Sequence, residues 1–372
     1  MIATQTKELK LIDKAAYDFS KKELLPEREE NDKFPFGPFF DSALKKAYEL
    51  DFFHAMLPET CGGIGQGITS LCVILENISQ EDSSLSGIIL SNAAAFEILL
   101  STGNEALLKK MIESADQVYT MLTAFPLFSD PSQVRMLPKA VKGKEGYELS
   151  GSLEYLVIGG IAGQAIVPAT LEKSTGYSFF LVNLKEKGVR VSDPIHSLGL
   201  HSCPAVDLTL SNAPSTLLGE EKSGPLHFKK MADRLSVAAA AISTGLMKGS
   251  LKEALEYTKK RSQGGRTIIN WSELKLMMAN MAIKTKNAEM VVASACQALD
   301  SKEAGWEECC RAAALLIQEM ACDITTDGIQ VMGGVGYMKD FGQEKRYRDA
   351  KHIQAVFGLT PVKKLKHLDE LL

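Results

Sequence analysis

The side chains in this sequence that could act as nucleophiles or metal ligands do not form a familiar catalytic spacing. The cysteines include no CxxC pair and no Cys/His ligand pattern, so we expect no metal site. Cys203 has no identifiable base partner, which argues against a thiol nucleophile. We expect most thiols to be small buried hydrophobes of a protein in the reduced cytoplasm. The seven cysteines are Cys61, Cys72, Cys203, Cys296, Cys309, Cys310 and Cys322.

Two other features of the sequence are candidates for a cofactor site or for an ionic interaction. The sequence GGVG at 333–336 forms a glycine-rich turn, but it lacks the GxGxxG pattern and follows no predicted strand. It therefore does not predict a Rossmann dinucleotide site. The neighbouring residues Asp233 and Arg234 lie beside an apolar helical stretch. An arginine in such surroundings needs a charged partner, and Asp233 could be that partner.

Composition excludes several classes of protein. The chain has 372 residues, of which 45% are hydrophobic and 24% charged, so it is neither disordered nor collagen-like. Its net charge of −4 gives no basic field for nucleic acid. The sequence contains no run of about 18 apolar residues, so we predict no membrane span. The charged N-terminus lacks the apolar middle of a signal peptide.

Patterning divides the chain into an N-terminal helical domain (1–118), a β domain (119–222) and a C-terminal helical bundle (223–372). Apolar residues recur at helical spacing in the outer zones, whereas β-branched residues and frequent turns fill the middle zone. The absence of βαβ alternation argues against a Rossmann fold. We predict an α+β protein with an antiparallel middle domain and a four-helix bundle, whose long helices are 227–261, 271–298 and 306–328.

Four stretches in the same order together resemble the acyl-CoA dehydrogenase family of flavoproteins. The first contains a Pro-Glu and Gly-Gly loop, the second the end of the β domain, the third the first bundle helix, and the fourth a Gly-Gly turn followed by Arg-Asp-Ala. These stretches are 57–67, 197–224, 232–261 and 327–354.

The resemblance implies binding sites for FAD and for the substrate. The family's flavin-binding loop corresponds to LTAFPLFSD, in which Thr123 and Ser129 remain as candidates to touch the isoalloxazine edge. Tyr155 keeps the aromatic residue that packs on the flavin. Val157 stands where a threonine usually bonds it. Arg234 corresponds to an arginine near the coenzyme A wall of the active site.

The bundle supplies the other implied cofactor contacts. Arg261 corresponds to the arginine that meets the FAD pyrophosphate of a neighbouring subunit, a role suited to the forked guanidinium group. Gln330, Gly333 and Gly334 correspond to the loop that holds the adenosine part of FAD across the dimer interface. The glycines there would permit a close backbone approach.

The family's usual catalytic base is missing. Alignment through RDAK at 348–351 puts Phe357 at the position of the glutamate that removes the substrate's α-proton, and Gly358 at the following glycine. Residue 357 could still offer its backbone N–H to the thioester oxygen. A minority branch of the family places the glutamate just before the helix arginine. The resemblance therefore nominates Asp233 as a relocated base, one methylene shorter than glutamate.

The resemblance implies α,β-dehydrogenation of an acyl-CoA, with electrons passed to electron-transfer flavoprotein, in a homotetramer or dimer of dimers. An Asp233→Asn variant should then retain FAD and lose flavin reduction. Two alternatives remain open. One is a base-deficient subunit that completes a related chain's FAD site in a hetero-oligomer, and the other is a thioester-binding flavoprotein that performs no net oxidation. The added bulk of Phe125, Phe128 and Phe357 hints at a small or unusual acyl group.

Overall fold

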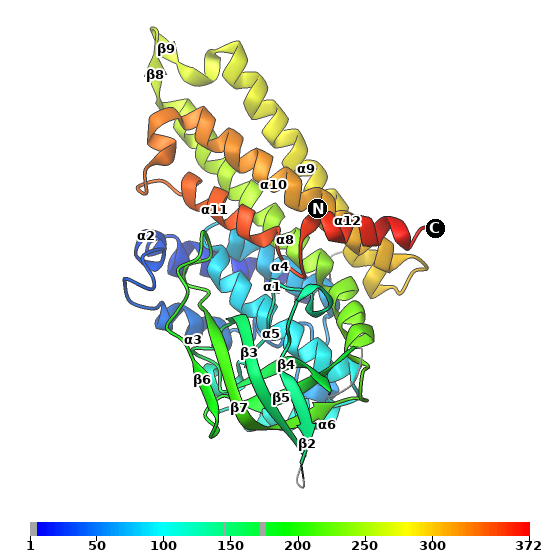
Figure 1. Cartoon of the computed structure of the whole chain (residues 1–372). Coiled ribbons are helices and arrows are strands. Elements are labelled where there is room, and N and C mark those ends of the chain that lie inside the picture. Colours follow the sequence, from blue (N-terminus) through cyan, green and yellow to red (C-terminus); the bar gives the residue numbers. More distant parts are fainter. Residues whose placement is uncertain (1–5, 144–145, 172–175) are drawn as a thin grey trace.

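The fold is that of a computed structural model, which describes residues 6–143, 146–171 and 176–372. A group of N-terminal helices lies between a small β domain and a set of long C-terminal helices, which project away from the β domain (Figure 1). The predicted α+β architecture of helical domain, β domain and helical bundle is confirmed.

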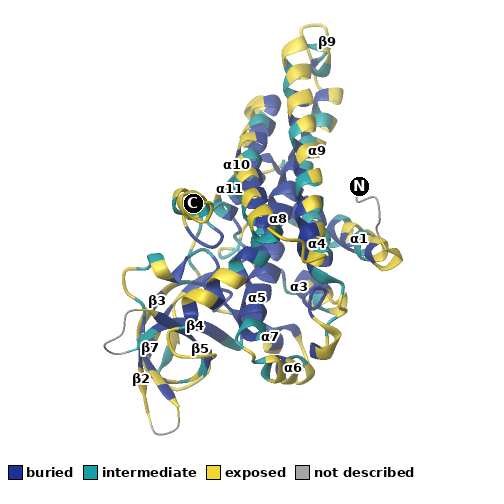
Figure 2. Cartoon of the chain, turned by 90° about the vertical axis from the view of Figure 1, so that its right-hand side faces the viewer, coloured by how far each residue is buried: buried dark blue, intermediate teal, exposed yellow. Residues whose placement is uncertain are grey.

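The N-terminal part is built around one apolar helix, α5 (Ser83–Ser101), which begins where the side chain of Asp82 accepts the N–H of Ser84. By length and composition α5 could cross a membrane, contrary to the expectation from sequence. However, 94% of its apolar window is buried inside the protein, where it forms the dark centre of Figure 2. The other helices of this part are α1 (Lys7–Phe19), α2 (Arg28–Asn31), α3 (Asp41–Glu49), α4 (Gly67–Ser79), α6 (Glu105–Glu113) and α7 (Val118–Met121).

The middle part is a closed sheet. The hydrogen-bonded order is β1-β4-β2-β3-β7-β5, and β5 also pairs with β4, so that five strands form a barrel without free edges. Most pairs are antiparallel as predicted, but β4 pairs with β1 and β2 in parallel. The strands are β1 (Thr123–Ala124), β2 (Lys139–Lys142), β3 (Tyr147–Val157), β4 (Gln164–Leu171), β5 (Tyr177–Asn183), β6 (Val189–Val191) and β7 (Ala205–Leu218).

The C-terminal part packs around α8 (Gly224–Lys260), whose middle is a buried run of small residues. A Cβ added at Gly245 would lie 2.4 Å from the carbonyl oxygen of Glu76 on α4, so only glycine allows these two helices to approach so closely. The remaining elements are the hairpin β8 (Ser262–Gln263) and β9 (Arg266–Thr267), and the helices α9 (Ser272–Asp300), α10 (Trp306–Met332), α11 (Gln343–Ile353) and α12 (Thr360–Asp369).

The Arg-Asp-Ala stretch on α11 ties the three parts together. Asp349 accepts the backbone N–H of Leu200 at 2.7 Å and pairs with Lys345 at 2.7 Å. Lys345 also reaches Asp82, at the start of α5. Because all these groups are buried, each charge depends on its partner, and α11 is fixed between the β domain and α5. This helix positions the residues that follow it.

Candidate active-site cavity

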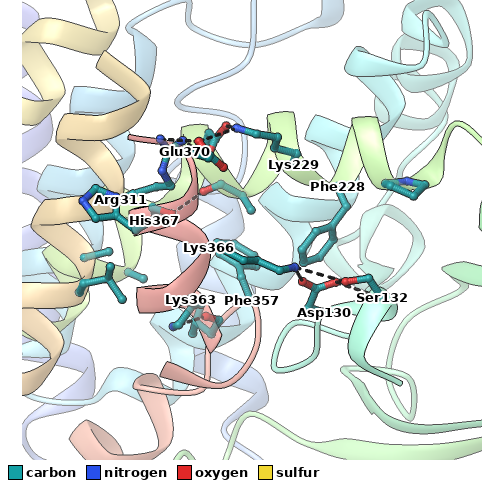
Figure 3. Close-up of a pocket in the computed structure, with 18 of the residues that line it drawn as sticks. Asp130, Ser132, Phe228, Lys229, Arg311, Phe357, Lys363, Lys366, His367 and Glu370 are labelled. Atoms are coloured by element: carbon teal, nitrogen blue, oxygen red, sulfur yellow. Dashed lines mark hydrogen bonds and ion pairs between the residues drawn. The ribbon is translucent and has the colours of Figure 1, made fainter. Parts of the chain in front are cut away.

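A cavity of about 260 Å³ lies directly after α11, at the position where the sequence resemblance expects the base. Its walls are the first turns of α8, the first half of α10, the helix α12, the segment Asp130–Ser132 and the residues that follow α11 (Figure 3). These segments are far apart in the sequence. The cavity therefore exists only because the β domain and the bundle meet at this point.

Four ionised side chains form a closed network along one side of the cavity. Asp233 pairs with Lys229 and with Arg311, each at 2.7 Å. Glu370 pairs with the same two cations, at 3.2 Å from Lys229 and 2.6 Å from Arg311. Figure 3 shows Lys229 and Arg311 reaching towards Glu370 from α8 and α10. Positive and negative charges alternate around the network, so each carboxylate contacts two cations.

Asp233, the nominated base, does line the cavity and is 6% exposed. Each of its two carboxylate oxygens contacts a cation, Lys229 or Arg311, so neither oxygen is free of a partner. The sequence suggested a pair between Asp233 and Arg234, but the two do not pair. Instead Arg234 lies 2.9 Å from Glu97 of α5, and burial raises the pKa of Glu97 although Arg234 opposes that effect. Arg234 does not line this cavity.

Phe357 occupies the position of the usual glutamate and points into the cavity (Figure 3). Its ring packs edge-on against Phe228, with the ring centroids 6.3 Å apart. Its backbone N–H donates to the carbonyl of Leu127 at 2.8 Å. The expectation that this N–H is available to a thioester oxygen is therefore wrong for the structure as it stands. Gly358, with φ of +112°, follows in a conformation that disfavours other residues.

Two lysines of α12 also line the cavity, and sequence reasoning missed both. Lys366 pairs with Asp130 at 2.6 Å, which links α12 to the β domain. Lys363 donates to the carbonyls of Val356 at 2.8 Å and Gln354 at 3.0 Å. Burial lowers the pKa of Lys363 to about 8. The signal in the sequence was only a run of cations after residue 358, which is also typical of a solvated helix face.

The predicted flavin contacts of the β domain lie together. Phe125 forms a bridge to Val157, so the segment that begins with Thr123 runs beside the end of β3. The Thr123 hydroxyl donates to the carbonyl of Met121 and accepts from Gln164, both at 3.3 Å. Val157 is fully buried and offers no polar side chain, as expected.

Tyr155 and Ser129 belong to the same region. The Tyr155 ring packs against Phe128, the residue before Ser129, with the centroids 5.9 Å apart. The Tyr155 hydroxyl bonds to Ser197 and, at 3.1 Å, to His352. The His352 Nδ1–H donates to the carbonyl of Gly199, and burial lowers the pKa of this imidazole. A neutral His352 thus accepts from Tyr155 and fixes the orientation of its ring.

The predicted contacts of the bundle lie elsewhere. Arg261 ends α8 next to the hairpin, and Gln330 lies in the last turn of α10, at the end of the bundle far from the barrel (Figure 1). Both side chains are exposed, and Arg261 has no ion-pair partner among the described residues. Gly333 has φ of +61°, and a Cβ added at Gly333 or Gly334 would meet no atom within 4 Å. The turn is therefore open, and contact of these residues with the phosphate and adenosine parts of FAD stays a prediction.

Comparison with known proteins identifies the family of the chain. The acyl-CoA dehydrogenase N-terminal domain matches residues 6–115, and the acyl-CoA dehydrogenase C-terminal domain matches residues 230–366. The chain is 30% identical to a 3-(aryl)acrylate reductase of Clostridium sporogenes, with 99% of both chains covered. It is 29% identical to the CarC subunit of a caffeyl-CoA reductase–Etf complex of Acetobacterium woodii, with 96% of both covered.

Solved structures share the whole fold. Butyryl-CoA dehydrogenase of Megasphaera elsdenii superimposes with a TM-score of 0.90 at 23% identity, and both chains are fully covered. A chain described with the electron transferring flavoprotein of Acidaminococcus fermentans gives 0.91 at 27% identity, again over both full chains. PigA, solved as an FAD complex, gives 0.88 at 21% identity and covers 100% of this chain and 99% of its own.

FAD is the cofactor that the family and its FAD-bound structures indicate. The two domain matches together cover well over half of the sequence, and the cavity lies at the family's base position. The chain belongs to the acyl-CoA dehydrogenase family.

Proposed function

We propose that this chain is an oxidoreductase that acts at the α and β carbons of an acyl thioester and exchanges electrons with an electron-transfer flavoprotein. The cavity beside Phe357 holds the acyl group. Two relatives support the choice of substrate and partner, since one is named as part of a caffeyl-CoA reductase–Etf complex and the other as an arylacrylate reductase. Bound FAD supplies the two-electron chemistry at the β carbon.

We further propose that reduction of the double bond is the working direction. The dehydrogenation typical of the family uses a carboxylate as the base for the α-proton. The carboxylates lining the cavity are Asp130, Asp233 and Glu370, and each is paired with at least one cation. This pairing, together with phenylalanine at the base position, is the observation that carries the proposal. Asp233 remains the candidate base for the opposite direction, which is the dehydrogenation that the sequence resemblance implies.

The aromatic pair Phe228 and Phe357 suits a flat acyl group. Both rings face the cavity and are edge-on to each other, so that a planar arylacrylyl group can stack on one ring and meet the edge of the other. The ionic network on the other side keeps the remaining cavity groups in fixed positions. We therefore expect a cinnamoyl thioester to react faster than a crotonyl thioester of the same carrier.

A visible spectrum of the purified protein tests the function. Yellow protein, reduced anaerobically, should be reoxidised by cinnamoyl-CoA within seconds. Oxidised protein should be bleached more slowly by the saturated thioester. Absence of both reactions in protein that holds FAD would overturn the proposal and favour a thioester-binding flavoprotein without net oxidation.

A second candidate function rests on the separation of the two groups of cofactor contacts. Arg261 and Gln330 are exposed at the far end of the bundle, where they could complete the FAD site of another chain. Like copies would give the homotetramer or dimer of dimers expected from the family. An unlike partner would make this chain the base-deficient subunit of a hetero-oligomer. Colourless protein that gains flavin only with a second, related chain would establish the latter.

A further inference from the structure

One lysine that lines the cavity has neither an opposite charge beside it nor a place in the ionic network. Lys363 is half-buried, and no carboxylate among the described residues lies within ion-pair distance of it. All the other lysines and the arginine that line the cavity are paired with carboxylates. These cations are Lys229, Arg311 and Lys366.

The contacts of the Lys363 ammonium leave one of its three N–H groups weakly held. Two of them donate to the carbonyls of Val356 and Gln354, at 2.8 and 3.0 Å. The third acceptor, the side-chain oxygen of Gln318, is 3.4 Å away, at the limit of a hydrogen bond. A neutral amine could keep the two short bonds and leave its lone pair free. Lys363 can therefore gain or lose one proton and still keep its hydrogen bonds to the carbonyls of Val356 and Gln354.

The Lys363 amine also lies close to position 357, where the family's base is expected. Val356, its nearest acceptor, directly precedes Phe357, and both residues line the cavity. The amine thus lies beside the backbone of the position where the family's base is expected. The Lys363 side chain, from α12, can therefore replace the acidic side chain that is missing at position 357.

We propose that Lys363 transfers the proton to the α carbon of the substrate in this cavity. The inference rests on the proposed function. After the double bond has received two electrons and a hydrogen at the β carbon, the α carbon carries the electron pair of a thioester enolate. One N–H bond of the Lys363 ammonium breaks, that electron pair forms the new C–H bond, and a neutral amine remains. Solvent returns the proton.

Burial, and not a neighbouring charge, sets the pH dependence of Lys363. Burial lowers its pKa to about 8, so the ammonium and the amine are both accessible near neutral pH. The ion pairs nearby balance one another, so none of them holds the amine in one state. The titratable and charged groups that line the cavity come from four parts of the fold. They are Asp130 and Tyr177 from the β domain, Lys229 and Asp233 from α8, Arg311 from α10, and Lys366, His367 and Glu370 from α12 and its C-terminal end.

The competing explanation is that Lys363 only caps the carbonyls after α11. Lys363→Gln separates the two roles, because an amide can still donate to both carbonyls but cannot transfer a proton. Lys364→Gln is the matched control, since Lys364 is exposed on the same helix and pairs with Glu319 outside the cavity. Thermal unfolding and FAD content verify that each variant is folded.

Two measurements of opposite pH dependence test the proposal. In single-turnover reduction of cinnamoyl-CoA, the wild-type rate should fall as pH rises through about 8, because the ammonium is the donor. Exchange of the α-hydrogen of the saturated thioester into D2O, followed by NMR without net oxidation, should rise over the same pH range. Lys363→Gln should slow both by about 100-fold or more and abolish both pH dependences, whereas Lys364→Gln should match wild type.

The outcomes distinguish the two levels of the proposal. If wild-type protein binds FAD but performs neither reaction, the proposed function is wrong. If wild-type protein turns over and the rates of Lys363→Gln are within threefold of the wild-type rates, only the proposed role of Lys363 is wrong. Should the variant not fold, the wild-type profiles decide, since rates that are flat between pH 7 and 9 exclude a group with the titration of Lys363.

Discussion

Asp233 and Arg311 form a 2.7 Å ion pair across the cavity wall, between α8 and α10. The pair joins residues that are 78 positions apart. It changes the interpretation of Asp233, because Arg311 and Lys229 each occupy one of its carboxylate oxygens. Asp233 thus lies where a relocated base would lie, but its surroundings favour an anchor for two cations.

The variant Asp233→Asn should therefore affect binding more than chemistry. We expect the protein to retain FAD, the KM for the thioester to rise, and the single-turnover rate to fall by less than tenfold. Loss of the Asp233 charge from this network should lower the free energy of unfolding by ~1–3 kcal/mol. A hundredfold loss of flavin bleaching with FAD retained would instead establish Asp233 as the base. Anaerobic stopped-flow absorbance and thermal unfolding measure the two effects.

The helix α12 should open more easily than the rest of the bundle. It has no buried residue of its own, so polar contacts such as Glu370 with Arg311 and Lys229 hold it in place. Glu370→Gln should accelerate amide hydrogen exchange in α12 and leave exchange in α8 unchanged. The global stability should fall by less than about 1 kcal/mol, because the Glu370 side chain is 34% exposed.

Salt provides the control for α12. Raising the ionic strength from about 0.05 to 0.5 M should accelerate wild-type exchange in α12 towards that of Glu370→Gln, because salt screens partly exposed ion pairs. Exchange in α12 that is as slow as in α8, and insensitive to salt, would contradict a helix held by polar contacts.

Acid should destabilise the protein through the carboxylates that surround α11. Burial alone would raise the pKa of Asp349, but Lys345 and Arg348 outweigh it and lower that pKa. For Asp32, burial is likewise outweighed by the hydrogen bond with His201 and by Lys345 and Arg348. Because the folded-state pKa values are depressed, this stability is present above the unfolded pKa of about 4 and is lost as pH falls through the folded values.

Asp349→Asn keeps the shape of the side chain and removes only the charge. We expect it to lower the free energy of unfolding at pH 7 by ~3–5 kcal/mol, because Lys345 loses a buried ion-pair partner and Arg348 loses a nearby negative charge. Its remaining stability should depend less on pH between 5 and 3 than that of wild type. The exposed Asp340 offers a control, since Asp340→Asn should leave both the stability and its pH profile unchanged.

His201 should contribute a pH dependence of opposite sign. Its pKa is raised chiefly by the side-chain hydrogen bond with Asp32, whose Oδ1 lies 3.1 Å from its Nδ1. The resulting stability is fully present below the unfolded pKa of about 6.5 and is lost as pH rises through the higher folded value. Denaturant unfolding of His201→Gln between pH 6 and 9 should show a flatter profile than wild type. An unchanged profile would remove His201 from this dependence.

Much of the fold could be predicted from local patterns. The three long bundle helices were expected at 227–261, 271–298 and 306–328, and they run at Gly224–Lys260, Ser272–Asp300 and Trp306–Met332. Apolar periodicity and turn residues determine such elements locally. The parallel pairs of β4 could not be predicted, because strand order depends on contacts between distant segments.

For the site, the sequence alone determined that phenylalanine replaces the usual glutamate, because residue 357 follows directly from a recognisable stretch. Only the tertiary structure decided what surrounds that position. Arg311 pairs with Asp233, Arg234 pairs with Glu97, and Lys363 folds back beside Val356. Side-chain pairing and burial are set by which helices meet in space. A lysine in a cationic helix therefore has the same sequence signature whether water or a cavity surrounds it.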